Sequence, residues 1–246
     1  VKVLSSDKFG GRAPSSEGEK LTLDYLTEQF TAIGFKPGNG DSFLQEVPLV
    51  SIEASTDMSL AIGGKNYQYG TEMVLGSSRI TQLSELKDSE LVFVGYGIIS
   101  EDFGYDDYKG IDVEGKIVVV LTGRPDDLPS EEGAHIGSGS EKIKHAAKNG
   151  AVGFITIHTP KRDAVRTFAK SASYADSPRL SWLDKKGMPF GKYPEIKGGA
   201  YLSAEHAHAL FEGAERKLAD VLTDDTNNVA IKGFALKSSV KMANKS

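Results

Sequence analysis

The segment from Ser89 to Gly123 constrains the fold of this 246-residue chain more than any other stretch. It contains two short apolar runs, 91–94 and 117–121, that are rich in β-branched residues, and such runs bounded by turn residues are typical of strands. Glycines and aspartates lie between them, and a turn at Glu114-Gly115 precedes the second run. Because that run contains no polar residue, we expect a strand that is buried on both faces.

The block from 143 to 158 continues this pattern. Small apolar side chains share one face of a helix that starts near Ser140 and ends at Asn149-Gly150: Ile143, Ala146 and Ala147. The run 152–157 then predicts a strand after a tight turn. Together the two segments predict a β-rich α/β fold, in which helices flank a sheet or a small open barrel between about Val47 and Ile231.

A separate amphipathic helix is predicted near the N-terminus. Ser16 followed by Glu19 forms a capping box, and Gly34 ends the helix after Ile33. Its apolar stripe follows helical spacing: Leu23, Leu26, Phe30 and Ile33. Such a stripe requires a surface to pack against, so this helix is expected to belong to a further domain or to meet a second copy of the chain.

Other segments have weaker signals. Strands are predicted at 43–49, 58–62, 67–69 and 180–183, with a hairpin turn at Gly63-Gly64. A helix is predicted from Ser203 to Leu218, and residues 124–139 are predicted as a loop. Short strand pieces are predicted at 229–231 and 234–236.

The bulk composition argues against several classes of partner. With 29 basic and 34 acidic residues the net charge is -5, which does not suit a nucleic-acid binder that relies on a basic field. No run approaches the roughly 20 apolar residues of a membrane span, and the first residues lack the pattern of a signal peptide. The absence of cysteine removes disulfides, thiolate metal sites and a cysteine nucleophile. We expect no nucleic-acid and no membrane partner.

An acidic loop offers the clearest candidate for a metal site. Its carboxylates are oxygen ligands of the kind that calcium prefers: Glu101, Asp102, Asp106, Asp107 and Asp112. Their spacing lacks the regular alternation of a calcium loop, and aspartate is an ordinary turn former. Capping and turn roles are therefore favoured, while calcium binding by residues 101–112 stays open.

The histidines and the basic segment do not form a recognisable site. Glu131, Glu132 and His135 lack the H-E-x-x-H spacing of a zinc helix, so a solvated loop is favoured. Two residues apart on a helix, His206 and His208 would point about 200 degrees apart and could not share an ion. For His145, a surface position or a structural role with its hydrogen bonds satisfied is favoured over a catalytic role. A solvated helix face is favoured over a nucleic-acid-binding patch for the basic residues Lys161, Arg162, Arg166 and Lys170. No catalytic, cofactor-binding or metal-ligating residue is assigned.

Three segments in order resemble the protease-associated (PA) domain, a module inserted in many exported peptidases: VFVGYGI, DDYKGIDVEGKIVVVL and KIKHAAKNGAVGFITI. The N-terminal block LSSDKFGGRAPSSEGEKLTLDYLTEQFTAIGFKPGNG is similar to the opening of secreted zinc aminopeptidases related to bacterial leucyl aminopeptidase and glutamate carboxypeptidase. The resemblance implies three parts: residues 1–46 from a peptidase domain, 47–233 as the PA domain, and 234–246 as a linker back toward the peptidase domain.

The resemblance also implies a pair of zinc ions held by His, Asp and Glu, with a Glu as general base. The first ligand pair of that family is an H-x-D motif, and none of the five histidines here has an aspartate two residues later. We therefore expect no cofactor in this chain, and two zinc ions in a catalytic domain that lies outside it.

This resemblance predicts a non-catalytic accessory portion of a zinc-dependent aminopeptidase, inactive alone, that modulates substrate access, domain stability or protein contacts. The parent protein would remove N-terminal residues from peptides, and would be secreted or periplasmic with its signal peptide removed. Expected partners are the catalytic peptidase domain, a peptide or protein substrate, and a second copy through the N-terminal helix. Two alternatives remain open: a stand-alone protein-binding or sorting module, and a small-molecule enzyme with a carboxylate site in 101–112.

Overall fold

A computed structural model describes residues 1–53, 55, 57–76, 80–175 and 177–245 of the chain. The chain divides into two compact units, unit 1 from Val1 to Pro48 and unit 2 from Leu49 to Ser246. Each unit is described by itself. Of the helices in the described ranges, none has the length and hydropathy that crossing a membrane requires.

Unit 1 consists of a 3-10 turn, η1 (Asp7–Phe9), and a helix, α1 (Glu17–Ala32). The Ser16 hydroxyl accepts a hydrogen bond from the Glu19 amide at 3.2 Å, which confirms the predicted N-cap. The Glu19 carboxylate accepts from the amide of Ser15 at 2.6 Å rather than from that of Ser16. Gly34, at a φ of 83°, follows the last turn, so the predicted end of the helix is also confirmed.

The packing of unit 1 depends on a glycine in the first turn of α1. A Cβ at Gly18 would lie 2.0 Å from the carbonyl oxygen of Phe9, so only glycine lets η1 approach the helix so closely. Phe9 is buried and meets Tyr25 edge-on, with ring centroids 6.2 Å apart. The far end of the predicted stripe stays exposed, since Phe30 is 36% and Ile33 66% accessible.

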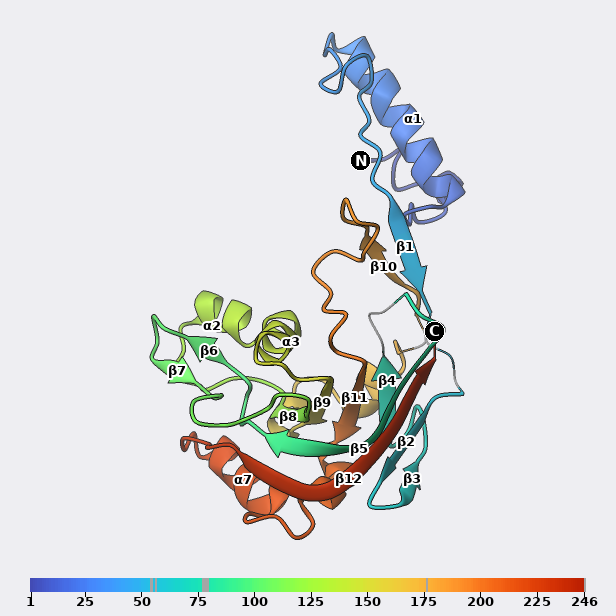
Figure 1. Cartoon of the computed structure of the whole chain (residues 1–246). Coiled ribbons are helices and arrows are strands. Elements are labelled where there is room, and N and C mark those ends of the chain that lie inside the picture. Colours follow the sequence, from blue (N-terminus) through green and yellow to red (C-terminus); the bar gives the residue numbers. More distant parts are fainter. Residues whose placement is uncertain (54, 56, 77–79, 176, 246) are drawn as a thin grey trace. The chain divides into compact units, whose positions relative to one another are not determined.

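Unit 2 is built around a curved eight-stranded sheet with the order β3-β2-β12-β5-β8-β9-β11-β4 (Figure 1). The strands of this sheet are β2 (Ser59–Ile62), β3 (Lys65–Tyr67), β4 (Met73–Gly76), β5 (Leu83–Phe93), β8 (Ile117–Leu121), β9 (Gly153–His158), β11 (Gly198–Ser203) and β12 (Phe234–Lys245). Strands β5, β8, β9 and β11 are parallel to one another, whereas β12 and β4 run antiparallel to their neighbours. Two small sheets pair β1 (Leu49–Ile52) with β10 (Arg179–Trp182), and β6 (Ile99–Ser100) with β7 (Tyr105–Asp106).

The helices of unit 2 are short. They are α2 (Ser130–Ile136), α3 (Gly139–Lys148), α4 (Pro160–Asp163), α5 (Phe168–Ala172), α6 (Ala204–Ala207), the 3-10 turn η2 (His208–Phe211) and α7 (Leu218–Thr226). Figure 1 shows α3 on one face of the sheet and α7 on the other. The predicted β-rich α/β fold, with helices flanking a sheet, is confirmed.

Strand β8 lies at the centre of this arrangement. All five of its side chains are 0% exposed, as expected for an apolar run with no polar residue. Ile117, Val119 and Leu121 join the larger hydrophobic cluster with η2 and α7, while Val118 and Val120 join a second cluster that includes Ala146 of α3. Because side chains alternate across the strand, β8 contributes to the hydrophobic core on each face of the sheet.

The predicted helix from Ser203 to Leu218 is wrong in its extent. The α-helical segment α6 ends at Ala207, η2 follows to Phe211, and Gly213 adopts a φ of 69° that no continuing helix allows. Residues 124–139, predicted as a loop, contain α2 instead. The predicted strand at 43–49 begins only at Leu49.

Residues 234–246, predicted as a linker, form β12 from Phe234 to Lys245, hydrogen-bonded between β2 and β5. Its inward side chains alternate with exposed ones, and a register shift between Leu236 and Val240 interrupts that alternation. The interruption is the reason why the sequence indicates only a short strand piece. Residues 229–231, predicted as a strand, lie outside any strand.

Candidate functional site

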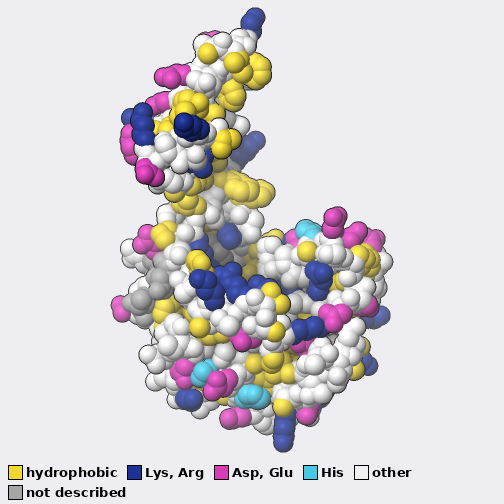
Figure 2. Space-filling model, turned by 180° about the vertical axis from the view of Figure 1, so that it is seen from behind, with side chains coloured by type: hydrophobic (Ala, Val, Ile, Leu, Met, Phe, Trp, Pro, Cys, Tyr) yellow, Lys and Arg dark blue, Asp and Glu magenta, His cyan; other side chains and the backbone are white. Residues whose placement is uncertain are grey.

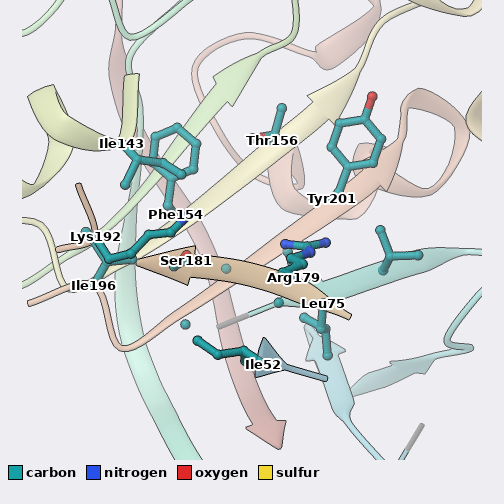
Figure 3. A pocket seen from close by; sticks show the side chains of 15 residues that line it. Ile52, Leu75, Ile143, Phe154, Thr156, Arg179, Ser181, Lys192, Ile196 and Tyr201 are labelled. Carbon is teal, nitrogen blue, oxygen red and sulfur yellow. The ribbon is translucent and has the colours of Figure 1, made fainter. Parts of the chain in front are cut away.

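A groove of about 260 Å³ lies in unit 2 (Figure 3). It lies against β4, β9 and β11 on one side and against the β1–β10 ribbon on the other. Its apolar surface comes mainly from side chains of the sheet and from one loop residue: Val74, Phe154, Ala200 and Ile196. We call this cavity the sheet-edge groove, because β4 is the edge strand of the large sheet.

Strand β10 supplies the polar side of the sheet-edge groove. Side chains alternate along a strand, and Arg179 and Ser181 line the groove whereas Leu180 and Trp182 do not. Trp182 instead stacks on Phe190, with ring centroids 4.8 Å apart. The pairing of β10 with β1 thus fixes which side chains face the groove.

Two cations line the groove without a carboxylate partner. Arg179 and Lys192 are exposed, and neither forms an ion pair with any residue in the described part of the chain. A Cβ at Gly76 would lie 3.1 Å from Nη1 of Arg179, so the glycine leaves room for the guanidinium over the edge strand. Figure 3 shows Arg179 on the side of Leu75 and Tyr201, and Lys192 on the side of Phe154.

Tyr201 forms a fixed wall of the groove. Its hydroxyl is hydrogen-bonded to Nδ1 of His158, and its ring stacks on Phe168 with centroids 5.7 Å apart. Nε2 of His158 lies 3.0 Å from the Asp163 carboxylate. Burial raises the pKa of Tyr201 and lowers the pKa of His158. The tyrosine therefore presents its ring to the groove and keeps its polar end engaged behind it.

The composition of the groove combines apolar and cationic surface. Its lining holds no His, Asp or Glu among the described residues. It does offer an apolar surface, the hydroxyls of Ser181 and Thr156, and two positive charges. A ligand with one apolar and one anionic part matches this lining.

A second polar cluster is buried beneath α3. Nζ of Lys142 donates to the carbonyl oxygens of Leu121 at 2.9 Å and Gly123 at 2.6 Å, and it lies 5.6 Å from the ring centre of Tyr96. Lys142 is only 2% exposed, and burial lowers its pKa to about 7. The lysine thus links α3 to the end of β8.

Two aspartates share this buried region. The Asp107 carboxylate accepts from the Ile98 amide at 2.9 Å, and burial raises its pKa to about 6. Asp225 accepts a hydrogen bond from the Tyr96 hydroxyl, and its other oxygen, Oδ2, is buried with no hydrogen-bond partner among the described residues. A small cavity of about 210 Å³ borders Tyr96 and Asp107.

Within the acidic loop, Asp106 and Asp112 have the predicted turn roles. Asp106 accepts from the Tyr108 amide at 3.1 Å, and Asp112 accepts from the Glu114 amide at 3.0 Å. Glu101 and Asp102 are exposed. Asp107 differs from the rest because it is drawn into the buried cluster. No group of three or more His, Asp or Glu side chains in the described ranges is arranged to hold a metal ion.

The histidines that sequence singled out lie in different places. His135 is exposed on α2 beside Glu131 and Glu132, and His145 is half-buried on α3, where burial lowers its pKa. Nε2 of His206 lies 3.2 Å from the Glu72 carboxylate, and its Nδ1 lies 2.8 Å from the Ser203 hydroxyl.

The Ser203 hydroxyl also accepts from the His206 amide at 3.4 Å, so this serine acts as the cap of α6. His208 is exposed and is not part of this set of contacts. The structure therefore does not bring His206 and His208 together.

The basic residues predicted to lie on one solvated helix face are spread over two short helices, α4 and α5, and the residues beside them. Lys161 pairs with Asp126 at 2.6 Å, while Arg166 and Lys170 lie 5.0 and 5.2 Å from the ring centre of Tyr174. Arg162 is exposed on α4. Three of the four basic side chains therefore have an ion-pair or cation–π partner at the surface, as expected for a solvated surface.

Residues 87–181 match the PA domain family. The chain contains a PA domain. The matched segment includes β8, α3, β9 and the groove residue Arg179, so part of the sheet-edge groove belongs to the PA domain itself. No curated protein gives a significant match to the chain.

Two solved structures of bacterial enzymes resemble the chain. An aminopeptidase from Aneurinibacillus sp. strain AM-1 shares 18% identity and a TM-score of 0.40 over 98% of this chain and 45% of that enzyme. A zinc aminopeptidase from Bacillus subtilis shares 14% identity and a TM-score of 0.36 over 100% of this chain and 43% of that enzyme. The chain thus spans less than half the length of either enzyme.

Sequence reasoning did not single out the cations of the sheet-edge groove or the buried Lys142. Arg179 comes just before the strand predicted at 180–183, and Lys192 lies in a loop between glycines, so neither stands out in the sequence from ordinary surface cations. Only the folded structure, in which β10 pairs with β1, shows that Arg179 and Lys192 line the same groove.

Proposed function

We propose that this chain is the non-catalytic accessory portion of a zinc-dependent aminopeptidase. One observation carries the proposal: a PA domain over residues 87–181 follows an N-terminal block that resembles the opening of secreted zinc aminopeptidases. None of the five histidines carries the H-x-D motif of those enzymes. In this proposal the pair of zinc ions belongs to a catalytic domain that partners this chain within one protein.

The parent protein would remove N-terminal residues from peptides, and would work outside the cytoplasm, secreted or periplasmic, after loss of a signal peptide. The accessory portion would act on substrate access, on the stability of the catalytic domain, or through protein contacts. The β1–β10 ribbon supports a contact role, because large apolar side chains on and beside it are exposed: Leu49 at 37%, Leu180 at 43%, Trp182 at 51% and Phe190 at 57%.

The proposal is tested by assaying the purified chain for hydrolysis of leucine p-nitroanilide in the presence of zinc. We expect no turnover above the rate without protein, and no stoichiometric zinc after equilibrium dialysis. A zinc aminopeptidase assayed in the same buffer serves as the positive control. Turnover by the chain that a chelator abolishes and zinc restores would contradict the proposal.

A further inference from the structure

We propose that the sheet-edge groove binds an extended acidic peptide. Acidic side chains of the peptide pair with Arg179 and with Lys192, and an apolar side chain two positions away covers the floor formed by Phe154 and Val74. The inference rests on the groove alone. Peptide binding by this chain and peptide hydrolysis by a parent enzyme can therefore fail independently.

The charge of the groove selects an anion. Its lining contains one guanidinium and one ammonium group and no carboxylate among the described residues. The chain as a whole has a net charge of -5, so two cations in one groove whose described lining has no carboxylate are a local departure from its average. Figure 2 shows Lys and Arg side chains gathered beside a hollow in the surface of unit 2. A planar guanidinium forms a pair of parallel hydrogen bonds with a carboxylate, which favours a carboxylate ligand.

The shape of the groove selects an extended chain. The apolar floor and the cations lie side by side, and in an extended peptide residues i and i+2 face the same way. An acidic residue and an apolar residue two positions apart can therefore reach Arg179 and the floor together. A free inorganic anion would leave the apolar floor exposed to water, so it matches only half of the lining.

Strand β4 places the groove at the margin of the large sheet. It pairs with β11 on one side, and in the described ranges no strand pairs with residues 74–76 on the other. Val74 and Leu75 line the groove but are only 8% and 2% exposed, so the peptide is expected to bind through its side chains rather than by adding a strand.

The probe is the blocked peptide acetyl-Glu-Thr-Val-Thr-Glu-amide, in which both Glu side chains and the Val side chain share one face when extended, and its neutral twin carries Gln in place of Glu. Binding is measured by calorimetry and by the fluorescence of Trp182, the single tryptophan of the chain, which follows Ser181 of the groove. We expect the acidic peptide to bind about tenfold more tightly than its twin, because only it forms charge-assisted hydrogen bonds. Raising the salt concentration should reduce that difference.

Variants locate the site. Arg179→Gln should weaken binding of the acidic peptide about tenfold, and Lys192→Gln about threefold, because the ammonium pairs as a single point charge. Neither should change binding of the Gln twin. Lys185→Gln is the matched control, since Lys185 is exposed in the same loop region but does not line the groove, and it should bind as the parent chain does.

Several results would overturn the inference. They are equal binding of both peptides, unchanged binding by Arg179→Gln, or a loss with Lys185→Gln as large as that with Arg179→Gln. A neutral peptide with a free carboxyl terminus that binds more tightly than the acidic probe would also overturn it, because the groove would then recognise chain ends. Arg179 is exposed, so Arg179→Gln should fold as the parent chain does, and thermal melting of each variant checks this.

Discussion

The buried side chain of Lys142 connects helix α3 to the end of the central strand β8. Its position on α3 places Nζ at the end of β8, where the carbonyl oxygens of Leu121 and Gly123 accept its hydrogen bonds. Asp107 and Asp225 act on the same ammonium group electrostatically. A buried ammonium group is tolerated here because it has hydrogen-bond partners and nearby carboxylates.

This environment predicts a pH dependence of stability. The pKa of Lys142 falls from 10.5 to about 7 on folding, so the unfolded chain holds one more proton between these values. The free energy of unfolding should therefore rise with pH between about 7 and 10.5, by up to about 1.4 kcal/mol per pH unit, relative to Lys142→Met. Urea unfolding at pH 7, 8 and 9 measures the difference.

The control for that experiment is Lys148→Met, which removes an exposed lysine from the same helix. It should leave the pH dependence of the parent chain unchanged. Asp107, with a pKa of about 6, acts in a lower range: it holds its proton longer in the folded chain, so its effect makes stability fall between pH 3.8 and about 6. An identical pH slope in the parent chain and in Lys142→Met would contradict the account.

At the scale of elements, β8 is the strand on which both cores depend. Ile117 is 0% exposed and packs over Gly153 of β9, where a Cβ would lie 2.9 Å from its Cγ1. Ile117→Ala should therefore lower the free energy of unfolding by about 3 kcal/mol, because the close packing leaves a cavity. Val165→Ala, at a site that is 78% exposed, should change it by less than about 0.5 kcal/mol. Chemical denaturation that finds equal effects would show that β8 is not central.

The apolar end of α1 predicts self-association. Ile33 and Phe35 are 66% and 61% exposed, and exposed apolar clusters promote association. We expect light scattering to show a concentration-dependent dimer that Ile33→Ser combined with Phe35→Ser weakens at least about tenfold. Lys20→Ser, an exposed polar change on the same helix, should leave it intact. A monomer at all concentrations would rule out this contact.

The elements that sequence predicted well are those in which local preference and tertiary environment agree. Strand β8 is apolar throughout, and α1 has Ser16 and Gly34 at its ends, so both follow from short-range patterns. The break after Ala207 does not, because apolar residues continue at helical spacing to Leu218 while Gly213 turns the chain. Strand β12 was underestimated because a register shift interrupts its alternation.

The candidate site was harder to predict than the fold. The sheet-edge groove combines Arg179 and Lys192 with Val74 and Phe154, which come from four separate segments of the chain. No single segment holds a recognisable motif. Only the pairing of β1 with β10 and the position of β4 at the sheet edge bring these side chains to one surface.

At the scale of the whole molecule, the chain contains a PA domain within unit 2 and a separate helical unit before it. The proposed division of labour assigns binding and protein contacts to this chain and zinc chemistry to a partner domain. The expected boundaries of 1–46, 47–233 and 234–246 remain predictions, although the structure places Phe234–Lys245 within the sheet of unit 2.

The most direct test of this account compares the 246-residue chain with the protein encoded by the complete reading frame that contains it. Both are assayed for leucine p-nitroanilide hydrolysis and for bound zinc by elemental analysis. We predict that the full-frame protein binds about two zinc ions and shows chelator-sensitive hydrolysis, whereas the 246-residue chain shows neither. A full-frame protein with no such hydrolysis would contradict the account and favour a stand-alone binding module.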